Sequence, residues 1–410
     1  MVSSNDDLLL LNSTLSHVTV TSITVEANCG NAASFTSLDL TPFSLLTQLI
    51  VGSNSFVSVR EVNLSGLQRL TRVEVGFNSF RGGSGGGLHL NECSSLKSVV
   101  IGDGSFASFA VLGMAGVPLL EEVRIGNGCL KSVGELWFVG MSRLKRVIVG
   151  ENSLSNAEGD FSLKNCLSVT ELVIGSGSMK WFKSMEIACV PALETLRIGG
   201  DSLKNVNELR FVDLPKLKSV DVGEDSFTNT NGSFVLKNCS LINELVISNR
   251  SIASFTSFEV SVTPLLRTIR IGDGCLKHAD ELVLSGLPAL ESVMIGSDSF
   301  SQRSGHFALT SPSVKALVVG DGSFSQYTDC SIHDVPSLET LSIGDNSFVA
   351  SSLELKSLNG LKSVVIGRRG FENCERAVFE SLPELTSIQL GWSALSFKDI
   401  DNATLVMKSV

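Results

Sequence analysis

The sequence predicts a mainly β solenoid of about 16 coils, each about 24 residues long, with little α-helix. Three observations support this fold class. An Ile-Gly dipeptide recurs at a nearly constant interval, an alternating apolar segment follows in each interval, and 43% of the residues are hydrophobic and can supply a core. A fixed period of 20 to 50 residues is typical of stacked repeats, because each coil buries its apolar side chains against its neighbours.

The glycine of the Ile-Gly dipeptide defines the length of a coil. Most steps from one such glycine to the next are 24 residues, and a few are 23, 25 or 26. Ser248 takes the place of the glycine in one coil, and Glu26 takes it in a degenerate first coil. The sixteen positions cover nearly the whole chain: Glu26, Gly52, Gly76, Gly102, Gly126, Gly150, Gly175, Gly199, Gly223, Ser248, Gly272, Gly296, Gly320, Gly344, Gly367 and Gly391.

Each coil contains the pattern L-x-x-L-x-I-G-x-x-S-F, as in "LKSVVIGDGSF" (96–106) and "LETLSIGDNSF" (338–348). We interpret the leucine-containing part as a strand and the glycine-containing part as the bend that ends it. Two positions after the glycine, Asn, Asp or Gly predominates, and these residues tolerate turn conformations. A phosphate-binding loop would occur once, before a helix, with lysine following. The repeated "GDGSF" therefore predicts bends and not a nucleotide site.

The second half of each coil predicts another strand. Segments such as "ELWFVG", "ELRFVD" and "SFVLKN" carry apolar residues at every second position, which favours a strand over a helix. We therefore expect strands on the concave side and on the convex side of the solenoid. The phenylalanine that ends the pattern is expected to form a buried aromatic row: Phe56, Phe80, Phe106, Phe227, Phe300, Phe324 and Phe348.

A longer period of 73 residues lies on top of the coil period. Cys93, Cys166 and Cys239 are separated by this interval, so three coil types alternate along the chain. About five such three-coil units fit the sequence. We expect a single solenoid over residues 1–410, with a degenerate coil at 1–28 and a partial coil at 392–410.

Composition narrows the function classes. The formal net charge is −10, with acidic and basic residues mixed along the chain, which argues against a nucleic-acid-binding face. No stretch approaches 18 apolar residues, so no insertion into a membrane is expected. The N-terminal segment lacks the basic and apolar regions of a secretion signal, and the compartment stays unknown.

Cysteine usage favours buried thiols over disulfides or a metal site. The count of nine is odd, and cysteines three coils apart would be separated by roughly 14 Å. Only Cys166 and Cys189 lie on adjacent coils, and no Cys-x-x-Cys pair or Cys/His cluster occurs. No catalytic triad or cofactor motif is visible either. We therefore expect a non-enzymatic chain without metal or cofactor, whose free thiols are typical of the cytoplasm.

Six sequons would accept a surface glycan in a secreted protein: Asn12, Asn63, Asn231, Asn238, Asn249 and Asn402. A chain rich in Ser, Thr and Asn also contains such triplets by chance. Asn238 belongs to the repeated "KNC" element, whose copy at Asn165 is not a sequon.

The residue before the Ile of each Ile-Gly dipeptide is expected at the centre of the concave sheet. Arginines at this position recur with the 73-residue period and would occupy one rung in three. Arginine is enriched at protein interfaces. The alternative is that duplication copied the arginines, which then only pair with adjacent acids or contact solvent. The candidate partner-binding residues are Glu74, Arg124, Arg197, Asp221, Arg270 and Met294.

The coil pattern matches the leucine-rich-repeat core L-x-x-L-x-L-x-x-N-x-L, with Phe at the last apolar position. Its "IGxxSF" element resembles the "IGxxAF" element of BspA-like leucine-rich repeats, and the resemblance runs over nearly the full chain. The chain differs in having "LxLxxLPxL" where that family usually carries a Cys-containing "xxCxxL" segment. The resemblance implies a location on bacterial or protist surfaces and a role in adhesion and protein binding.

Three hypotheses for function follow. The first is a non-enzymatic module that binds a protein partner, or mediates adhesion, through the concave sheet and flanking loops. The second is a structural protein that self-associates into a filament or coat by stacking the ends or sides of the solenoid, because the coils are nearly uniform. The third is an enzyme with a site in a loop, for which "RGGSGGG" (81–87) is the one irregular loop of sufficient size.

Overall fold

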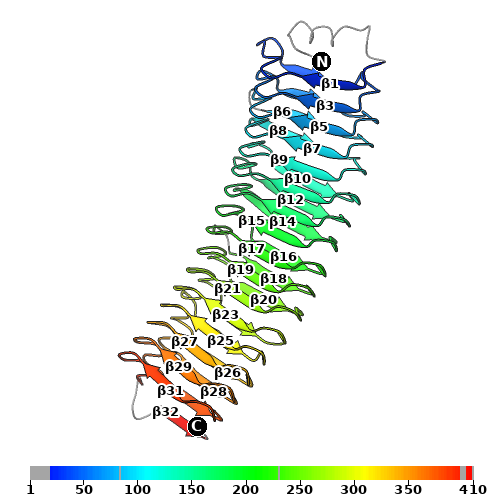
Figure 1. Ribbon diagram of the computed structural model, residues 1–410. Helices are drawn as coiled ribbons and strands as arrows, with labels where there is room; N and C mark the ends of the chain where they lie inside the picture. The colour runs from blue at the N-terminus through cyan, green and yellow to red at the C-terminus, as the bar shows by residue number, and fades with distance from the viewer. Residues whose placement is uncertain (1–18, 83–84, 230, 398–402, 409–410) are drawn as a thin grey trace. The chain divides into compact units, whose positions relative to one another are not determined.

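The computed structural model describes residues 19–82, 85–229, 231–397 and 403–408. These residues form strands joined by turns and bends, and none of them lies in an α-helix or in a helix that could span a membrane. Contacts group the chain into two units, unit 1 (residues 1–206) and unit 2 (residues 207–410), which we describe separately. Each unit is a stack of coils with strands along two faces (Figure 1). The predicted all-β solenoid is confirmed in each unit, whereas a single solenoid over 1–410 stays a prediction.

Strands of the L-x-x-L-x-I-G pattern form a parallel ladder that we call the front ladder. Each strand has four residues, and each unit contains eight such strands among its described residues. In unit 1 they are β1 (Ser22–Val25), β3 (Gln48–Val51), β5 (Arg72–Val75), β7 (Ser98–Ile101), β9 (Glu122–Ile125), β11 (Arg146–Val149), β13 (Glu171–Ile174) and β15 (Thr195–Ile198). In unit 2 they are β17 (Ser219–Val222), β19 (Glu244–Ile247), β21 (Thr268–Ile271), β23 (Ser292–Ile295), β25 (Ala316–Val319), β27 (Thr340–Ile343), β29 (Ser363–Ile366) and β31 (Ser387–Leu390).

The second half of each coil forms the back ladder, so the prediction of strands on a second face is confirmed. This ladder is interrupted within each unit. In unit 1 it comprises β2 (Ser37–Asp39), β4 (Glu61–Asn63), β6 (Gly86–His89) and β8 (Phe109–Gly113), then β10 (Glu135–Val139), β12 (Gly159–Lys164) and β14 (Phe182–Ala188). In unit 2 it comprises β16 (Glu208–Val212), β18 (Ser233–Lys237) and β20 (Ser257–Ser261), then β22 (Glu281–Leu284), β24 (His306–Leu309), β26 (Asp329–His333), β28 (Ser352–Lys356), β30 (Arg376–Glu380) and β32 (Thr404–Lys408).

The core of each unit lies between its two ladders. Rows of Leu, Ile and Val stack there, because every second residue of a strand points inward. In unit 1 the ring of Phe80 stacks between Phe56 and Phe106, with centroids 5.0 and 4.7 Å away. In unit 2 successive rings lie 4.7 Å apart and belong to Phe300, Phe324 and Phe348. All seven residues of the predicted aromatic row are buried.

The bends explain the repeated glycines. A Cβ at Gly102, directly after β7, would lie 2.7 Å from backbone atoms of Gly76 and Phe77 in the preceding coil, so the backbones approach too closely for a side chain. Two residues later, Gly104 has a φ of +70°, and other coils place Asn or Asp in the same left-handed conformation. Phe106 is also left-handed, with a φ of 53°. This conformation is unusual for a bulky residue and was not predicted.

Buried serines link successive coils. The Ser79 hydroxyl donates to the Gly52 carbonyl of the preceding coil at 3.0 Å and accepts the Ser55 N–H of that coil at 3.1 Å. The same two bonds recur at Ser323 in unit 2. Buried polar groups require such partners, so this row, the serine spine, ties the coils together. The repeat pattern places this serine in the bend but does not predict these hydrogen bonds.

The two predicted irregular coils lie only partly within the described residues. β1 belongs to the predicted degenerate coil at 1–28, of which residues 1–18 lie outside the description. β32 belongs to the predicted partial coil at 392–410 and pairs in parallel with β30. The front ladder therefore includes a strand of the first of these coils, and the back ladder includes a strand of the last.

Candidate functional site

The front-ladder strands alternate exposed and buried residues, so the first and third residues point outward. The third residue is the position predicted to lie at the centre of the sheet. In unit 1 the register aligns Val100, Arg124, Ile148, Val173 and Arg197 in one row. In unit 2 it aligns Asp221, Val246, Arg270, Met294 and Val318. The row therefore exists in each unit, and its role in binding stays a prediction.

In unit 1 two arginines flank two aliphatic rungs of this row. The Arg124 guanidinium lies 3.3 Å from the Glu122 carboxylate, which also lies 3.6 Å from Arg146. Arg197 is exposed and forms no ion pair with any residue that the structure describes. Since strands are about 4.8 Å apart, the Cα atoms of Arg124 and Arg197 are separated by roughly 14 Å. One small chemical group therefore cannot contact both arginines.

In unit 2 the row is an apolar strip with one cation. Met294 and Val318 are 44% and 40% exposed, next to Arg270 and along the same row. The Arg270 guanidinium lies 3.8 Å from the Glu244 carboxylate. Asp221 is exposed two rungs away from Arg270.

Glu74 is a less accessible member of the row. It is half-buried on β5 and forms an ion pair with Arg72 of the same strand. The structure thus gives an ion-pair partner within the front ladder to three candidates, namely Glu74, Arg124 and Arg270. For these three residues, the ion pairs favour the alternative given above, in which duplication copied the charged residues and they only pair with adjacent charges.

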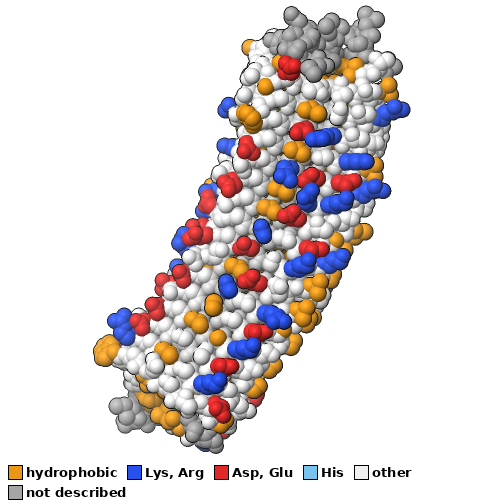
Figure 2. All heavy atoms as spheres, viewed as in Figure 1, with side chains coloured by type: hydrophobic (Ala, Val, Ile, Leu, Met, Phe, Trp, Pro, Cys, Tyr) orange, Lys and Arg blue, Asp and Glu red, His pale blue; other side chains and the backbone are white. Residues whose placement is uncertain are grey.

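Charges of alternating sign lie one residue before several front-ladder strands: β7, β9 and β11 in unit 1, and β21, β23, β25, β27 and β29 in unit 2. The Lys145 ammonium lies 2.7 Å from Glu121 and holds the pKa of that carboxyl below its usual value. Glu291 lies 3.1 Å from both Lys315 and Arg267, and the lysine, followed by the arginine, lowers its pKa. Acidic and basic side chains alternate over the face shown in Figure 2. Exposed pairs contribute little to stability, so this row mainly sets the charge pattern.

Side chains directly after the Ile-Gly glycine accept hydrogen bonds from backbone N–H groups of the next coil. The Asp103 carboxylate accepts the Asn127 N–H at 2.8 Å, and the Asn127 side chain accepts the Glu151 N–H at 2.7 Å. In unit 2 Asp321 accepts the Asp345 N–H at 2.7 Å. These residues therefore have a structural role that sequence reasoning missed. The signal was present, because Asn or Asp recurs there at the coil period.

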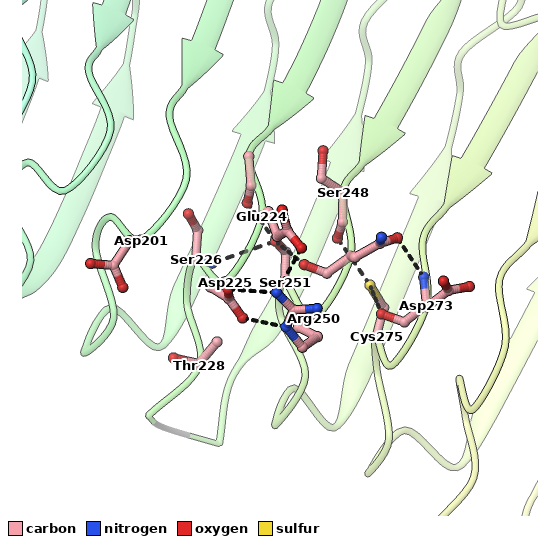
Figure 3. A network of polar contacts seen from close by, with 12 residues as sticks. Asp201, Glu224, Asp225, Ser226, Thr228, Ser248, Arg250, Ser251, Asp273 and Cys275 are labelled. Carbon is pink, nitrogen blue, oxygen red and sulfur yellow. Dashed lines mark hydrogen bonds and ion pairs between the residues drawn. The ribbon is translucent and has the colours of Figure 1, made fainter.

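Arg250 centres a cluster of charges on a bend of unit 2 (Figure 3). Its guanidinium donates to Asp225 at 2.8 and 2.9 Å and to Glu224 at 2.6 Å. Asp225, and then Glu224, raise the pKa of Arg250. The cluster was not predicted, because the three residues come from neighbouring coils and carry no common motif.

The cysteines are free thiols, and all except Cys189 are buried. Burial raises the pKa of Cys129 to about 11 and that of Cys275 to about 12, which disfavours the reactive thiolate. The Cys93 thiol donates to the Leu64 carbonyl at 3.1 Å. Among the described residues, no three His, Cys, Asp or Glu side chains gather as a metal site.

Three sequons are engaged in side-chain hydrogen bonds, and in the first of them the Asn63 oxygen accepts the Ser65 N–H at 3.1 Å. The Asn238 amide nitrogen donates to Asp213 at 2.8 Å, and the Asn249 oxygen accepts a backbone N–H of the next coil at 2.9 Å. Asn12 and Asn402 lie outside the described residues. Glycosylation stays a prediction.

The glycine-rich loop at 81–87 is described only in part, since residues 83 and 84 lie outside the description. Gly86 starts β6, and a Cβ there would lie 1.7 Å from the Arg60 carbonyl oxygen. Glycine is therefore required for the close approach of this coil to its neighbour. The hypothesis of a catalytic loop stays untested.

Comparisons with known proteins give similarity in fold alone. No protein-family model matches the chain, and a search of curated proteins gives no match. The functional domain of InlJ from Listeria monocytogenes, which includes a cysteine ladder, is 12% identical with a TM-score of 0.36. The match covers 85% of this chain and 65%, slightly less than two thirds, of that domain.

Two further solved structures are similar. A leucine-rich repeat protein from Bacteroides ovatus is 14% identical with a TM-score of 0.27, over 91% of this chain and 78% of that one. A leucine rich cell surface protein from Faecalibacterium prausnitzii is 12% identical with a TM-score of 0.20, over 84% of this chain and 79% of that one. The structural neighbours are thus leucine-rich-repeat proteins at low identity.

Proposed function

We propose that this chain is a non-enzymatic binding module that engages an extended protein partner through its front ladders. The observation that carries the proposal is the exposed third-position row, which aligns arginines with aliphatic side chains in each unit. A parallel ladder presents side chains at even spacing along its length, so it suits a long partner. Arginine and methionine are enriched at protein interfaces, which supports the same surface.

The row offers two kinds of contact. Arg197, which has no ion-pair partner among the described residues, can bind a partner carboxylate in a bidentate manner. Arg124 and Arg270 would exchange their glutamate partners for groups of the bound protein. The apolar strip around Met294 and Val318 would lose its exposure to water on binding, which is favourable.

The proposal extends to adhesion at a cell surface. The "IGxxSF" element resembles the BspA-like element, and the sequons would carry glycans in that location. Free buried thiols are also compatible with a reducing compartment, so the location needs a direct test. Labelling of intact cells with a membrane-impermeant reagent, followed by detection of this chain, distinguishes the surface from the cell interior.

The test of the binding proposal removes the three arginines together. The partner is first isolated by pull-down with the unaltered protein, and its affinity is then measured by calorimetry. We expect Arg124→Ala/Arg197→Ala/Arg270→Ala to weaken binding at least tenfold, with an unchanged circular dichroism melt. The matched control replaces three exposed arginines away from the row, namely Arg69, Arg143 and Arg376. Equal affinity of the ladder variant and the unaltered protein would contradict the proposal.

A second candidate function is self-association by stacking of coil ends. Ile388 and Leu390 align with buried residues of β29, yet they are 40% and 50% exposed. On the back ladder of the same unit, Leu405 and Met407 are 56% and 55% exposed. These four exposed apolar side chains favour self-association, because contact with a second copy would remove them from water.

Sedimentation velocity over a range of concentrations tests this candidate. We expect assemblies that grow with concentration and that disappear in Leu390→Glu/Leu405→Glu. The control, Leu241→Glu/Leu265→Glu, changes two exposed leucines elsewhere in unit 2 and should still assemble. A single monomeric species at every concentration would rule out self-association.

A further inference from the structure

The back ladder of unit 1 opens between β8 and β10. β8 pairs with β6 and β10 pairs with β12, but β8 and β10 do not pair with each other. The strands instead border a groove of about 490 Å³. A second opening lies between β20 and β22 in unit 2, two 73-residue periods further along the chain. The coil type alone does not decide the opening, because β26, one 73-residue period beyond β20, pairs with β28.

Small residues widen the groove of unit 1. Gly113, Ala115 and Gly116 line it at the end of β8 and just beyond. The equivalent coil of unit 2 carries larger residues at these positions, namely Glu259, Ser261 and Val262. The missing side chains in unit 1 leave room that unit 2 fills.

Outward-pointing apolar side chains line the groove. Trp137 and Val139 project from β10, and Val111 projects from β8, with 52%, 54% and 46% of their surfaces exposed. Met114 and Met141 are buried in its wall. An exposed tryptophan between two exposed valines is an energetically costly surface in water and is typical of an interaction site.

The groove is acidic beside the tryptophan. Glu135 precedes Trp137 by two residues on β10, so both side chains leave the same face of the strand. Glu135 forms no ion pair with the residues that the structure describes. An adjoining cavity is lined by Glu135, Glu158, Asp160 and Lys183, and the lysine is paired with Glu158. Glu135 therefore stands beside the exposed indole without an ion-pair partner among the described residues, whereas Asp160 interacts electrostatically with Lys183.

We propose that this groove binds an extended segment of a protein partner in which basic and apolar residues alternate. An arginine of the segment stacks on the Trp137 ring and pairs with Glu135, which combines a cation–π contact with a charged hydrogen bond. The apolar residues on either side cover Val111 and Val139. The edges of β8 and β10, which are not paired with each other, offer backbone groups to an extended chain. The Glu135 carboxylate, which has no ion-pair partner among the described residues, selects a basic segment over an acidic one.

A fluorescein-labelled peptide, Val-Arg-Val-Arg-Val, tests the proposal by fluorescence anisotropy with the full chain. We expect saturable binding of this peptide and at least tenfold weaker binding of Val-Glu-Val-Glu-Val. Trp137→Ala should weaken binding of the arginine peptide at least tenfold. Glu135→Gln should reduce the preference for Val-Arg-Val-Arg-Val over Val-Gln-Val-Gln-Val. Both residues are exposed, and circular dichroism checks that the variants are folded.

Matched controls locate the effect. Trp181→Ala changes an exposed tryptophan of unit 1 outside the groove, and Glu281→Gln changes the equivalent glutamate of unit 2; both should leave binding unchanged. The front-ladder variant Arg124→Ala/Arg197→Ala/Arg270→Ala should also bind normally, so the two surfaces are tested independently. The proposal is overturned by a lack of saturable binding, by equal binding of the glutamate peptide, or by an unaffected Trp137→Ala variant.

Discussion

The openings of the two back ladders occur at equivalent coils but have different linings. In unit 1 the groove between β8 and β10 carries an exposed tryptophan and two exposed valines. In unit 2 the groove between β20 and β22 has a volume of about 390 Å³ and presents small or aliphatic residues at the same three positions: Ser257, Val283 and Ser285. Openings at equivalent coils therefore differ in what they can bind, because individual outward residues line them.

The same division holds for the rest of each unit. Inside, stacked phenylalanines and the serine spine recur with little change in both units. Outside, residues vary from coil to coil because they are not constrained by stacking. Binding properties specific to this protein are therefore expected at outward residues, such as Trp137, that differ from the residues at the same position of other coils.

The largest effects should come from the shared interior. Phe80 in unit 1 and Phe324 in unit 2 are fully buried between two stacked rings. Phe80→Ala and Phe324→Ala should each lower the free energy of unfolding by about 3–5 kcal/mol, because each leaves a cavity. Urea denaturation followed by circular dichroism measures both. Phe77→Ala, at an exposed position, serves as the control. Clearly unequal losses of unfolding free energy for Phe80→Ala and Phe324→Ala would contradict the view that the two interiors are equivalent.

Intermediate effects should come from the serine spine. Ser178 and Ser323 each accept an N–H at 3.1 Å and donate to a carbonyl at 2.6 and 2.7 Å. Replacing either with alanine leaves buried groups without partners and should cost about 1–3 kcal/mol of unfolding free energy. Cys129→Ser, which restores a hydroxyl to the spine, should lose no stability. Alanine variants as stable as the parent would show that the spine contributes nothing.

The smallest effect on stability is expected at an exterior position where the two units carry different residues. Asp329 of unit 2 takes the place of Ser184 in the equivalent coil of unit 1, and burial, followed by Glu354, raises its pKa against a smaller opposing effect of His306. A carboxyl with a raised pKa in the folded state stabilises the fold when protonated, and this contribution is lost as pH rises through the folded pKa.

Asp329→Asn should therefore raise the urea midpoint near neutral pH, with a gain that disappears in acid below the pKa of the unfolded state. Urea unfolding over a range of pH measures this dependence. Ser184→Asn in unit 1 should show no such dependence. A pH-independent effect of Asp329→Asn would remove the electrostatic explanation.

Much of the fold follows from the sequence because one period fixes both ladders. The 24-residue step gives the register of the front row, and alternation within each strand gives the outward positions of Arg124, Arg197 and Arg270. The openings of the back ladder could not be predicted in this way. Segments such as "FAVLG" and "ELWFV" both satisfy the pattern of a strand, but the pattern does not specify whether adjacent strands pair.

The candidate sites show the same limit. The front row was predictable because its members occupy one position of the repeat. Its ion pairs were not, since Glu122 bridges Arg124 and Arg146 across two strands. The groove of unit 1 joins Trp137 to the glycines of another coil, and no single segment of sequence contains both.

The bonds of the serine spine have a direction with consequences for biosynthesis. Each hydroxyl contacts the coil that precedes its own in the chain, as Ser79 does with Gly52 and Ser55. When a coil leaves the ribosome, the preceding coil that its serine bonds to has already been synthesised. The coils can therefore stack during translation.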